Sequence, residues 1–263
     1  MGELNPAAAV GFDREAASYA SVRPRYSDAA LDLIGDAVGV AAGARVCDVA
    51  AGTGIFTRQL IERGYRVTAV EPVDGMRHEL AASRLEAVVV AARAEALPFM
   101  DRTFDAVVVA QAFHWFEADS ALVEIRRVLR PGGALVLTWN VRDESVDWVA
   151  RWTDLVHSMT GGRPYPDHRE RDWAEVVAEV GGFTPMQRSS FPNPQAATHA
   201  SVVERTRSTS FVAALDDERQ REVLDAVEQM IAGHPDLVGR DEFVFPYDTV
   251  VHWCHRLDLR PLD

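Results

Sequence analysis

The sequence contains no lysine: all 27 basic residues are arginine, and 40 acidic residues give a formal net charge of −13 at pH 7. A strongly acidic surface repels the phosphate backbone of nucleic acids. We therefore expect no nucleic-acid partner. The rest of the composition, with 48% hydrophobic and 25% charged residues, is typical of an ordinary globular protein.

Cysteines and long apolar runs are also scarce. Cys47 and Cys254 lie in apolar runs without metal-ligand spacing, which favours buried free thiols in a reducing compartment. The eight histidines are scattered, and we expect no metal site. No run reaches the length of a membrane-spanning helix, and the N-terminus lacks the pattern of a signal peptide. These absences predict a cytoplasmic protein that does not bind membranes.

The most informative stretch is residues 46–57, with the sequence VCDVAAGTGIFT. An apolar run passes through Asp48 into a turn of small residues that includes Ala50, Gly52 and Gly54, and a helical pattern follows. Glycine permits positive φ and lets a ligand approach the backbone, while the helix N-terminus offers unpaired N–H groups. Asp48 lies at the strand end where open α/β sheets bind ligands. The stretch therefore predicts a ligand site.

Two ligand classes use such a loop. A dinucleotide fold requires a third small residue, but that position is Thr57 here. The pattern Asp-x-Ala-x-Gly-x-Gly instead resembles the first motif of class I S-adenosylmethionine (SAM) methyltransferases, Asp/Glu-x-Gly-x-Gly-x-Gly, with Ala50 in place of the first glycine. The resemblance implies that Asp48, Ala50, Gly52 and Gly54 bind the cofactor.

A second acidic residue, Glu71, ends the apolar run at 65–70 and is followed by Pro72. In a nucleotide-binding fold a carboxylate at this place accepts hydrogen bonds from the ribose hydroxyls. Dinucleotide enzymes use the same contact, so Glu71 alone does not separate the two ligands. The resemblance places Pro72 at the cofactor and Met76 beside the adenine, although a methionine on a helix also fits a core position.

Residues 92–99 resemble the second cofactor segment of the same family, Gly-Asp-Ala-x-x-Leu-Pro-Phe. The Asp that usually accepts from the adenine amino group is replaced by Arg93. The resemblance leaves the backbone of Ala94 to bind the adenine ring, with Glu95 as the candidate replacement acid. For Arg93 itself we expect a surface ion pair with an acidic residue.

Residues 105–116, DAVVVAQAFHWF, closely resemble the fourth-strand region of the small-molecule (type 11) subgroup, which includes trans-aconitate and ubiquinone/menaquinone-biosynthesis methyltransferases. In that subgroup the strand tip lies beside the methionine part of SAM and the substrate. The resemblance implies that Gln111 contacts the cofactor, that His114 is the candidate catalytic base and that Trp115 lies near the substrate. The alternative for these aromatic residues is packing of a helix onto the sheet.

The N-terminal residues 12–26 resemble the segment that often covers the cofactor in this subgroup. Helical spacing predicts a helix that ends before Arg23-Pro24, because the residue before proline disfavours the α conformation. We expect Tyr19, Arg23 and Tyr26 to face the site as part of a lid, with Arg23 binding the carboxylate of an acidic acceptor. Packing against the body of the protein is the alternative.

The order of elements predicts one α/β domain over residues 1–263, and the resemblance implies a three-layer α/β/α Rossmann-like methyltransferase fold with a mixed seven-stranded sheet. Residues 1–40 would form the helical lid, 41–140 the cofactor-binding core, and 141–263 the remaining sheet with a helical insertion before the last strand. Later elements are expected as helices at 118–129, 146–159, 172–180 and 217–231, and strands at 134–139, 184–191 and 243–253.

The predicted function is transfer of the SAM methyl group to a small-molecule acceptor, with S-adenosylhomocysteine as product. The sulfonium is already activated, so the protein mainly aligns the acceptor and excludes water. A general base is needed only where the acceptor must lose a proton. Two alternatives stay open, a nicotinamide-dependent oxidoreductase and a non-catalytic SAM-binding protein. Monomer and homodimer are both open.

Overall fold

The computed structural model describes residues 23–162 and 171–258. The helix expected before Arg23, and Tyr19 with it, lies outside the described residues. The described chain divides into two compact units. The sheet unit comprises residues 25–139, 171–191 and 249–258, and the helical unit comprises residues 23–24, 140–162 and 192–248. The expectation of a single domain stays a prediction.

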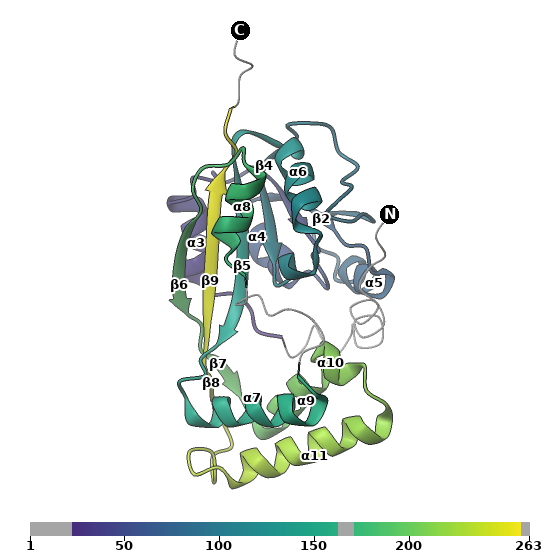
Figure 1. Ribbon diagram of the computed structural model, residues 1–263, viewed down its shortest axis with the longest axis vertical. Coiled ribbons are helices and arrows are strands. Elements are labelled where there is room, and N and C mark those ends of the chain that lie inside the picture. The colour runs from purple at the N-terminus through teal and green to yellow at the C-terminus, as the bar shows by residue number, and fades with distance from the viewer. Residues whose placement is uncertain (1–22, 163–170, 259–263) are drawn as a thin grey trace. The chain divides into compact units, whose positions relative to one another are not determined.

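Seven strands form one sheet in the order β3-β2-β1-β4-β5-β9-β6 (Figure 1). Its strands are β1 (Arg45–Val49), β2 (Arg66–Val70), β3 (Val88–Val90), β4 (Phe104–Ala110), β5 (Leu129–Arg142), β6 (Gln187–Pro192) and β9 (Tyr247–His255). β1 pairs in parallel with β2 and β4, β2 with β3, and β4 with β5. β9 runs opposite to β5 in Figure 1. The expected mixed seven-stranded sheet is confirmed.

Helices cover both faces of this sheet, which gives the predicted three layers (Figure 1). They are α3 (Asp28–Asp36), α4 (Ile55–Glu62), α5 (Asp74–Ala82), α6 (Ala118–Val128) and α8 (Trp173–Val180). Leu31 of α3 and Phe56 of α4 share one core cluster with Val108 of β4. Because side chains alternate along a strand, the buried Val107 points to the other face, where α6 packs beside α8.

The helical unit contains four helices and a two-stranded sheet within the described residues. They are α7 (Asp147–Thr160), α9 (His199–Arg207), α10 (Ser210–Ala213), α11 (Asp217–Gly233), β7 (Gln195–Ala197) and β8 (Phe243–Phe245). Trp148 and Trp152 of α7 pack edge-on against Phe245. α11 begins after Asp216, whose side chain accepts from the N–H groups of Glu218 and Arg219. The helical unit therefore contains an apolar core cluster of its own.

Two expected boundaries were wrong. β5 begins at Leu129 and not at 134, because the Pro-Gly-Gly stretch lies within the strand and Leu129 pairs with Phe104 beside a register irregularity. The strand expected at 243–253 is two strands: Pro246, which has no N–H group, separates β8, paired with β7, from β9 in the large sheet. β7, α9 and α10 were not predicted.

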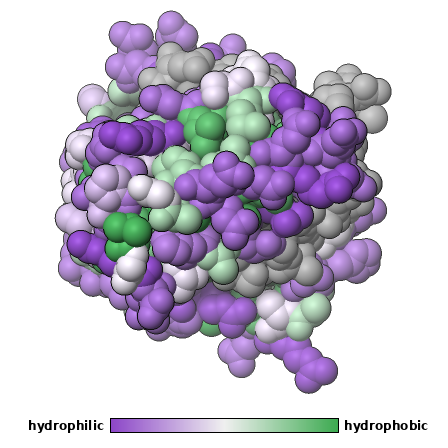
Figure 2. All heavy atoms as spheres, turned by 90° about the horizontal axis from the view of Figure 1, so that it is seen from below, coloured by the Kyte–Doolittle hydropathy of each residue, from purple (hydrophilic) through white to green (hydrophobic). Residues whose placement is uncertain are grey.

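Hydrophilic residues dominate the face drawn in Figure 2, and hydrophobic residues occur there in small separate patches. Within the described residues, the exposed large hydrophobic side chains are Val88, Met100, Val123, Val238, Val244 and Leu257. No helix in the described ranges combines the length and apolar character needed to cross a membrane.

Candidate functional site

The predicted cofactor residues lie at one edge of the sheet. β1 lies between β2 and β4, and the three strands are parallel, so their carboxyl ends meet at the same edge. Asp48, Glu71 and Gln111 stand at or just after these three ends. This is the edge at which open α/β sheets bind ligands.

The loop between β1 and α4 turns through left-handed backbone conformations. The φ angles are +57° at Ala50, +58° at Gly52 and +87° at Gly54. Ala50 therefore adopts the conformation for which glycine is suited, at a steric cost to its Cβ. Gly54 is the N-cap residue of α4. The helix thus begins directly at the loop, and its first N–H groups lie next to the candidate ligand space.

Asp48 is completely buried at the end of β1. Its Oδ2 accepts a hydrogen bond of 2.6 Å from the Thr57 hydroxyl, while its Oδ1 is buried and has no partner among the described residues. Burial raises the pKa of Asp48 to about 7; the Thr57 hydrogen bond opposes this shift, and the nearby Glu71 carboxylate adds to it. Thr57, noted in the sequence only as an argument against a dinucleotide, thus positions this carboxylate.

Glu71 is the second buried carboxylate at this edge, with 4% of its surface exposed. It accepts hydrogen bonds of 2.8 Å from the backbone N–H groups of Gly52 and Val73. Burial raises the pKa of Glu71, while these two N–H donors and Arg77 oppose the shift. The hydrogen bond from Gly52 to Glu71 links the loop after β1 to the end of β2. Two residues that are predicted to bind the cofactor are therefore in direct contact.

The residues after Glu71 are held by Arg77. Its Nη1 donates to the carbonyl oxygens of Glu71 and Pro72, each at 3.0 Å. Met76, on the first turn of α5, is buried with 3% exposure. Met76 is therefore a buried residue close to the end of β2. Its contact with adenine stays a prediction.

The loop after β3 carries Ala94 and Glu95. Ala94 is buried, and the predicted ion pair of Arg93 exists: its Nε lies 3.1 Å from Oε2 of Glu95. The other Glu95 oxygen accepts from the N–H of Glu117, before α6, at 3.1 Å. Both oxygens of Glu95 are therefore engaged within the protein, and each retains a further lone pair with which it could accept from an adenine amino group.

Arg127 of α6 fixes this loop and was missed by the sequence reasoning. It donates to the carbonyl oxygens of Phe99 (2.7 Å) and Leu97 (3.0 Å). Its carboxylate partners are Glu124 and Asp101. Glu124 in turn accepts from the N–H of Leu97. A charge pair three residues apart on one helix is common at surfaces, so no sequence signal marked it.

The end of β4 has a second strained residue, Gln111, with φ +60°. Its N–H donates to the carbonyl oxygen of Thr138 on β5 at 2.8 Å. A positive φ at a residue other than glycine is uncommon and concentrates at functional sites. This geometry turns the chain out of the sheet towards the short helix of Phe113–Trp115.

His114 lies in that short helix and contacts β5. The indole Nε1–H of Trp139 donates to Nδ1 of His114 at 3.3 Å. Because Nδ1 is an acceptor here, the proton of a neutral ring stands on Nε2. Trp139 also stacks on Trp173 with ring centres 5.7 Å apart, and Trp115 lies 5.2 Å from the His114 ring. These aromatic side chains pack against one another, and the hydrogen bond from Trp139 fixes the orientation of the His114 imidazole ring.

Two of the three predicted lid residues lie within the described residues, one in each compact unit. Tyr26 is buried and packs edge-on against Phe56, with ring centres 4.7 Å apart. Its backbone exchanges two hydrogen bonds with the Gln59 side chain. Arg23 belongs to the helical unit and donates to the carbonyl oxygen of Ser208 at 2.9 Å. Tyr19 lies outside the described residues.

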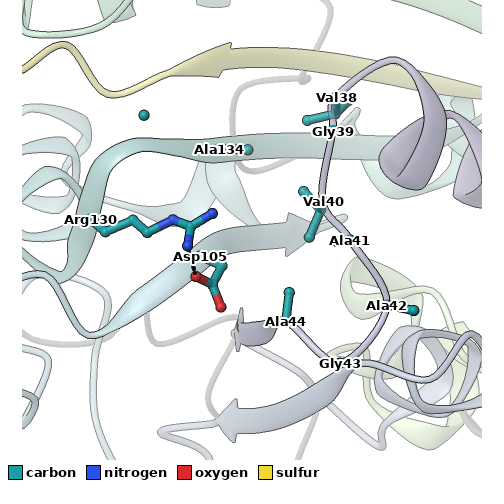
Figure 3. Close-up of a pocket in the computed structure, with 11 residues that line it drawn as sticks. Val38, Gly39, Val40, Ala41, Ala42, Gly43, Ala44, Asp105, Arg130 and Ala134 are labelled. Atoms are coloured by element: carbon teal, nitrogen blue, oxygen red, sulfur yellow. Dashed lines mark ion pairs between the residues drawn. The ribbon is translucent and has the colours of Figure 1, made fainter.

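A pocket of about 230 Å³ lies at the opposite edge of the sheet (Figure 3). It is lined by residues 38–44, by the amino ends of β4 and β5, and by an ion pair of 2.6 Å between Arg130 and Asp105. Its polar side chains neutralise one another. No group of three or more potential metal ligands occurs among the described histidine, cysteine, aspartate and glutamate residues.

The site at the carboxyl edge fits SAM on its own geometry. Oδ1 of Asp48 is a buried acceptor with no donor among the described residues, which suits a cationic N–H group. Glu71 supplies a second buried carboxylate at the end of the neighbouring strand, where the sequence predicts the ribose. Setting aside the adjacent residues of the chain, no described atom lies within 4 Å of where a Cβ of Gly52 would stand. A ligand therefore has direct access to this backbone.

Comparison with known proteins supports the same assignment. The sequence matches the family described as methyltransferase domain over residues 47–137. An uncharacterized methyltransferase of Mycobacterium tuberculosis is 35% identical over 241 residues, which cover 92% of this chain and 93% of that protein. The malonyl-[acyl-carrier protein] O-methyltransferase of Geobacter sulfurreducens is 30% identical over 214 residues, covering 77% of this chain and 79% of that protein.

A solved structure shares the fold. It comes from Anaeromyxobacter dehalogenans and is assigned to the type II methyltransferases. The TM-score is 0.65 at 21% sequence identity, and the match covers 89% of this chain and 97% of that one. The three-layer architecture is therefore common to both chains.

Proposed function

Since the chain belongs to the class I SAM-dependent methyltransferases, we propose that it transfers the methyl group of SAM to a small organic molecule. The observation that carries the proposal is the pair of buried carboxylates, Asp48 and Glu71, on either side of the glycine loop. Asp48 would accept from the cationic ammonium of the methionine part, and Glu71 would accept from the hydroxyls of the ribose that joins this part to adenine.

The remaining cofactor contacts follow from the strand order. The backbone of Ala94, after β3, would bond the adenine ring, with Met76 against its face. Gln111, at the end of β4, would lie beside the methionine part. Each of these three residues stands at the same edge of the sheet as Glu71. The cofactor would thus cross the ends of the parallel strands from β3 to β4.

Bound SAM supplies an activated methyl group on sulfur, which passes in line to the acceptor and leaves S-adenosylhomocysteine. The chain has to align the acceptor and exclude water. With Nδ1 accepting from Trp139, His114 presents an N–H donor at Nε2. We assign it the role of holding the acceptor, and it would act as a base only after the hydrogen bond to Trp139 is broken.

The acceptor class rests on two supports. The net charge of −13 disfavours nucleic acid. The name of the Geobacter relative, an O-methyltransferase, supports testing oxygen acceptors first.

A cytoplasmic location also belongs to this proposal, because Cys47 and Cys254 are both buried free thiols.

The oxidoreductase alternative is not retained. At the place where a dinucleotide loop needs a small residue, Thr57 is buried and its hydroxyl holds Asp48, and the relatives are methyltransferases. A non-catalytic SAM-binding protein would keep the same cofactor site, so turnover decides between that alternative and the proposed enzyme.

The test is thermal unfolding with SAM, S-adenosylhomocysteine and NADH. At a hundredfold excess over Kd, a ligand of the native state stabilises it by about 2.7 kcal/mol. We expect a higher Tm with SAM and its product, no change with NADH, and loss of the shift in Glu71→Ala. The exposed neighbour variant Asp74→Asn is the control. A shift with NADH alone would overturn the proposal, and transfer of isotope-labelled methyl to an acceptor panel would separate enzyme from binding protein.

A further inference from the structure

The pocket at the amino ends of β4 and β5 belongs to the sheet unit alone and lies at the edge opposite the predicted cofactor residues. Its volume of about 230 Å³ is below the roughly 300–1,000 Å³ that is typical of pockets for drug-sized ligands. SAM or a dinucleotide would therefore not fit, and the pocket suits a smaller molecule.

The segment of residues 38–44 forms one wall of this pocket. Hydrogen bonds from side chains hold its carbonyl oxygens in place. The hydroxyl of Tyr65 donates to the carbonyl oxygen of Val40 at 3.0 Å, and Nε2 of His255 donates to that of Val38 at 2.9 Å. Because the protein itself fixes this wall, a ligand would not have to order it on binding, which favours affinity.

The lining residues other than Arg130 and Asp105 are all valine, alanine or glycine. Setting aside the adjacent residues of the chain, no described atom lies within 4 Å of where a Cβ of Gly39, Gly43 or Gly132 would stand. These small residues leave room beside the backbone. The chemical class of the ligand is therefore decided by the two charged side chains.

Arg130 and Asp105 face one another at this pocket (Figure 3). Nη1 of Arg130 lies 2.6 Å from Oδ1 of Asp105, and the exposed fractions of the two side chains are 55% and 14%. Oδ2 of Asp105 accepts from the backbone N–H of Arg45 at 2.6 Å. The carboxylate is thus fixed from two sides, whereas the guanidinium is open to solvent.

Both side chains retain hydrogen-bonding capacity for a ligand. With Nη1 engaged, the guanidinium of Arg130 keeps the edge formed by Nε and Nη2, and this edge can donate to both oxygens of a carboxylate. Each oxygen of Asp105 has a further lone pair, which can accept from an ammonium group. Donors and acceptors therefore stand side by side in a pair without net charge.

The electrostatics of this pair favour a ligand that carries both charges. A carboxylate alone at Arg130 would stand beside the carboxylate of Asp105 in a chain of net charge −13, and an amine alone would stand beside the guanidinium. The nearby side chains of Arg45 and Arg66 are exposed to water, which screens them. In a zwitterion, each charged group meets a partner of opposite charge.

We propose that this pocket binds a small α-amino acid in its zwitterionic form, with the carboxylate on Arg130 and the ammonium group on Asp105. The site is separate from the predicted cofactor site, so the inference does not depend on the methyltransferase function. The amino acid is a ligand of the native protein and takes no part in methyl transfer.

The test is a nitrogen-15 NMR titration of the full chain with L-valine. Two analogues each lack one charge: isovalerate is valine without its ammonium group, and isobutylamine is valine without its carboxylate. We expect valine to shift the amide signals of Gly39, Gly43 and Gly132. Both analogues should bind at least about tenfold more weakly, because each loses a charge-assisted hydrogen bond.

Substitutions of the charged pair test the assignment of the two groups. Arg130→Met should weaken valine at least about tenfold. Arg45→Met removes the same charge from a neighbouring exposed side chain that does not line the pocket, and as the matched control it should keep the affinity. Asp105→Asn leaves Arg130 without its carboxylate and should reverse the preference, so that isovalerate binds more tightly than valine.

Two further variants test the location of the ligand. Ala44→Leu places a larger side chain in the lining and should abolish valine binding. Asp48→Asn, at the cofactor edge, should bind valine as the unsubstituted protein does. Loss of valine binding in Asp48→Asn would place the amino acid in the cofactor site and overturn the inference.

The inference would also be overturned if valine did not shift the three glycine signals, or if either analogue bound as tightly as valine. Both of these results come from the unsubstituted protein, so they decide the question even if a variant fails to fold. Unchanged affinity in Arg130→Met or Ala44→Leu, an equal loss in Arg45→Met, or a retained preference for valine in Asp105→Asn would overturn it as well.

Discussion

Gly52 and Gly54 lie two residues apart in the same loop, and both have positive φ, but their surroundings differ. A Cβ at Gly54 would stand 2.4 Å from Cδ1 of Leu80 and 3.2 Å from Cδ1 of Leu85. A Cβ at Gly52 would meet no described atom within 4 Å, apart from the adjacent residues of the chain. One glycine therefore serves packing of α4 against the protein, and the other leaves room for a ligand.

We expect alanine to have different effects at the two positions. Gly54→Ala should lower the free energy of unfolding by roughly 2–4 kcal/mol, because it combines left-handed strain with a clash against the buried Leu80. Gly52→Ala should cost only about 1 kcal/mol and yet lose SAM binding. Urea unfolding and SAM calorimetry measure the two effects. Equal loss of stability in both variants would contradict the division of roles.

Glu71 gives a second prediction. Glu71→Gln keeps an oxygen for the Gly52 N–H and removes the negative charge. Charge-assisted hydrogen bonds contribute roughly 1.5–3 kcal/mol, so SAM affinity should fall about tenfold to a hundredfold while the fold persists. Calorimetry with SAM and S-adenosylhomocysteine gives the affinities. Asp74→Asn, a nearby exposed carboxylate, should change neither. Unchanged affinity in Glu71→Gln would remove Glu71 from the ribose site.

The sheet could be predicted from the sequence because its parallel strands are buried, apolar and separated by strong turn signals. β1, β2 and β4 match their expected positions within a few residues, and Asp48 and Glu71 fall at the expected strand ends. At these places the local sequence is sufficient for the prediction, because a single apolar run specifies both the strand and the residue at its end.

The helical unit and the support of the site could not be predicted in the same way. Trp152 and Phe245 meet only after the chain has folded, and so do Arg205 and Tyr247, which are 42 residues apart. Arg127 acts on backbone carbonyls of another loop. Such contacts depend on tertiary geometry, and no residue type or spacing marks them. Pro246 shows the same limit: its missing N–H group is evident from the sequence, but the division that it makes between β8 and β9 is not.

The hydrogen bond between Trp139 and His114 predicts the tautomer of the imidazole. Nitrogen-15 NMR should show the His114 proton on Nε2 in the resting protein, and Trp139→Phe should remove this preference. Once an acceptor is found, His114→Gln, which retains a side-chain N–H donor, should keep kcat within about tenfold, whereas loss of a general base costs roughly 10²–10⁴-fold. A loss of the larger size in His114→Gln would restore the catalytic-base assignment.

Asp48 predicts how stability depends on pH. Its pKa is raised to about 7 in the folded protein, well above the ordinary value of an aspartate, so between the two values the native state holds more protons than the unfolded chain. The contribution of Asp48 to stability therefore falls as pH rises through this window, and the full cost of ionising the buried carboxyl group is present above pH 7.

Asp48→Asn, whose side-chain oxygen still accepts from Thr57, should remove this cost. We expect the variant to be more stable than the unsubstituted protein by about 2–4 kcal/mol at pH 8, with a much smaller difference at pH 5. Urea unfolding at both pH values measures this, and an equal difference at the two pH values would show that burial does not shift the carboxyl group.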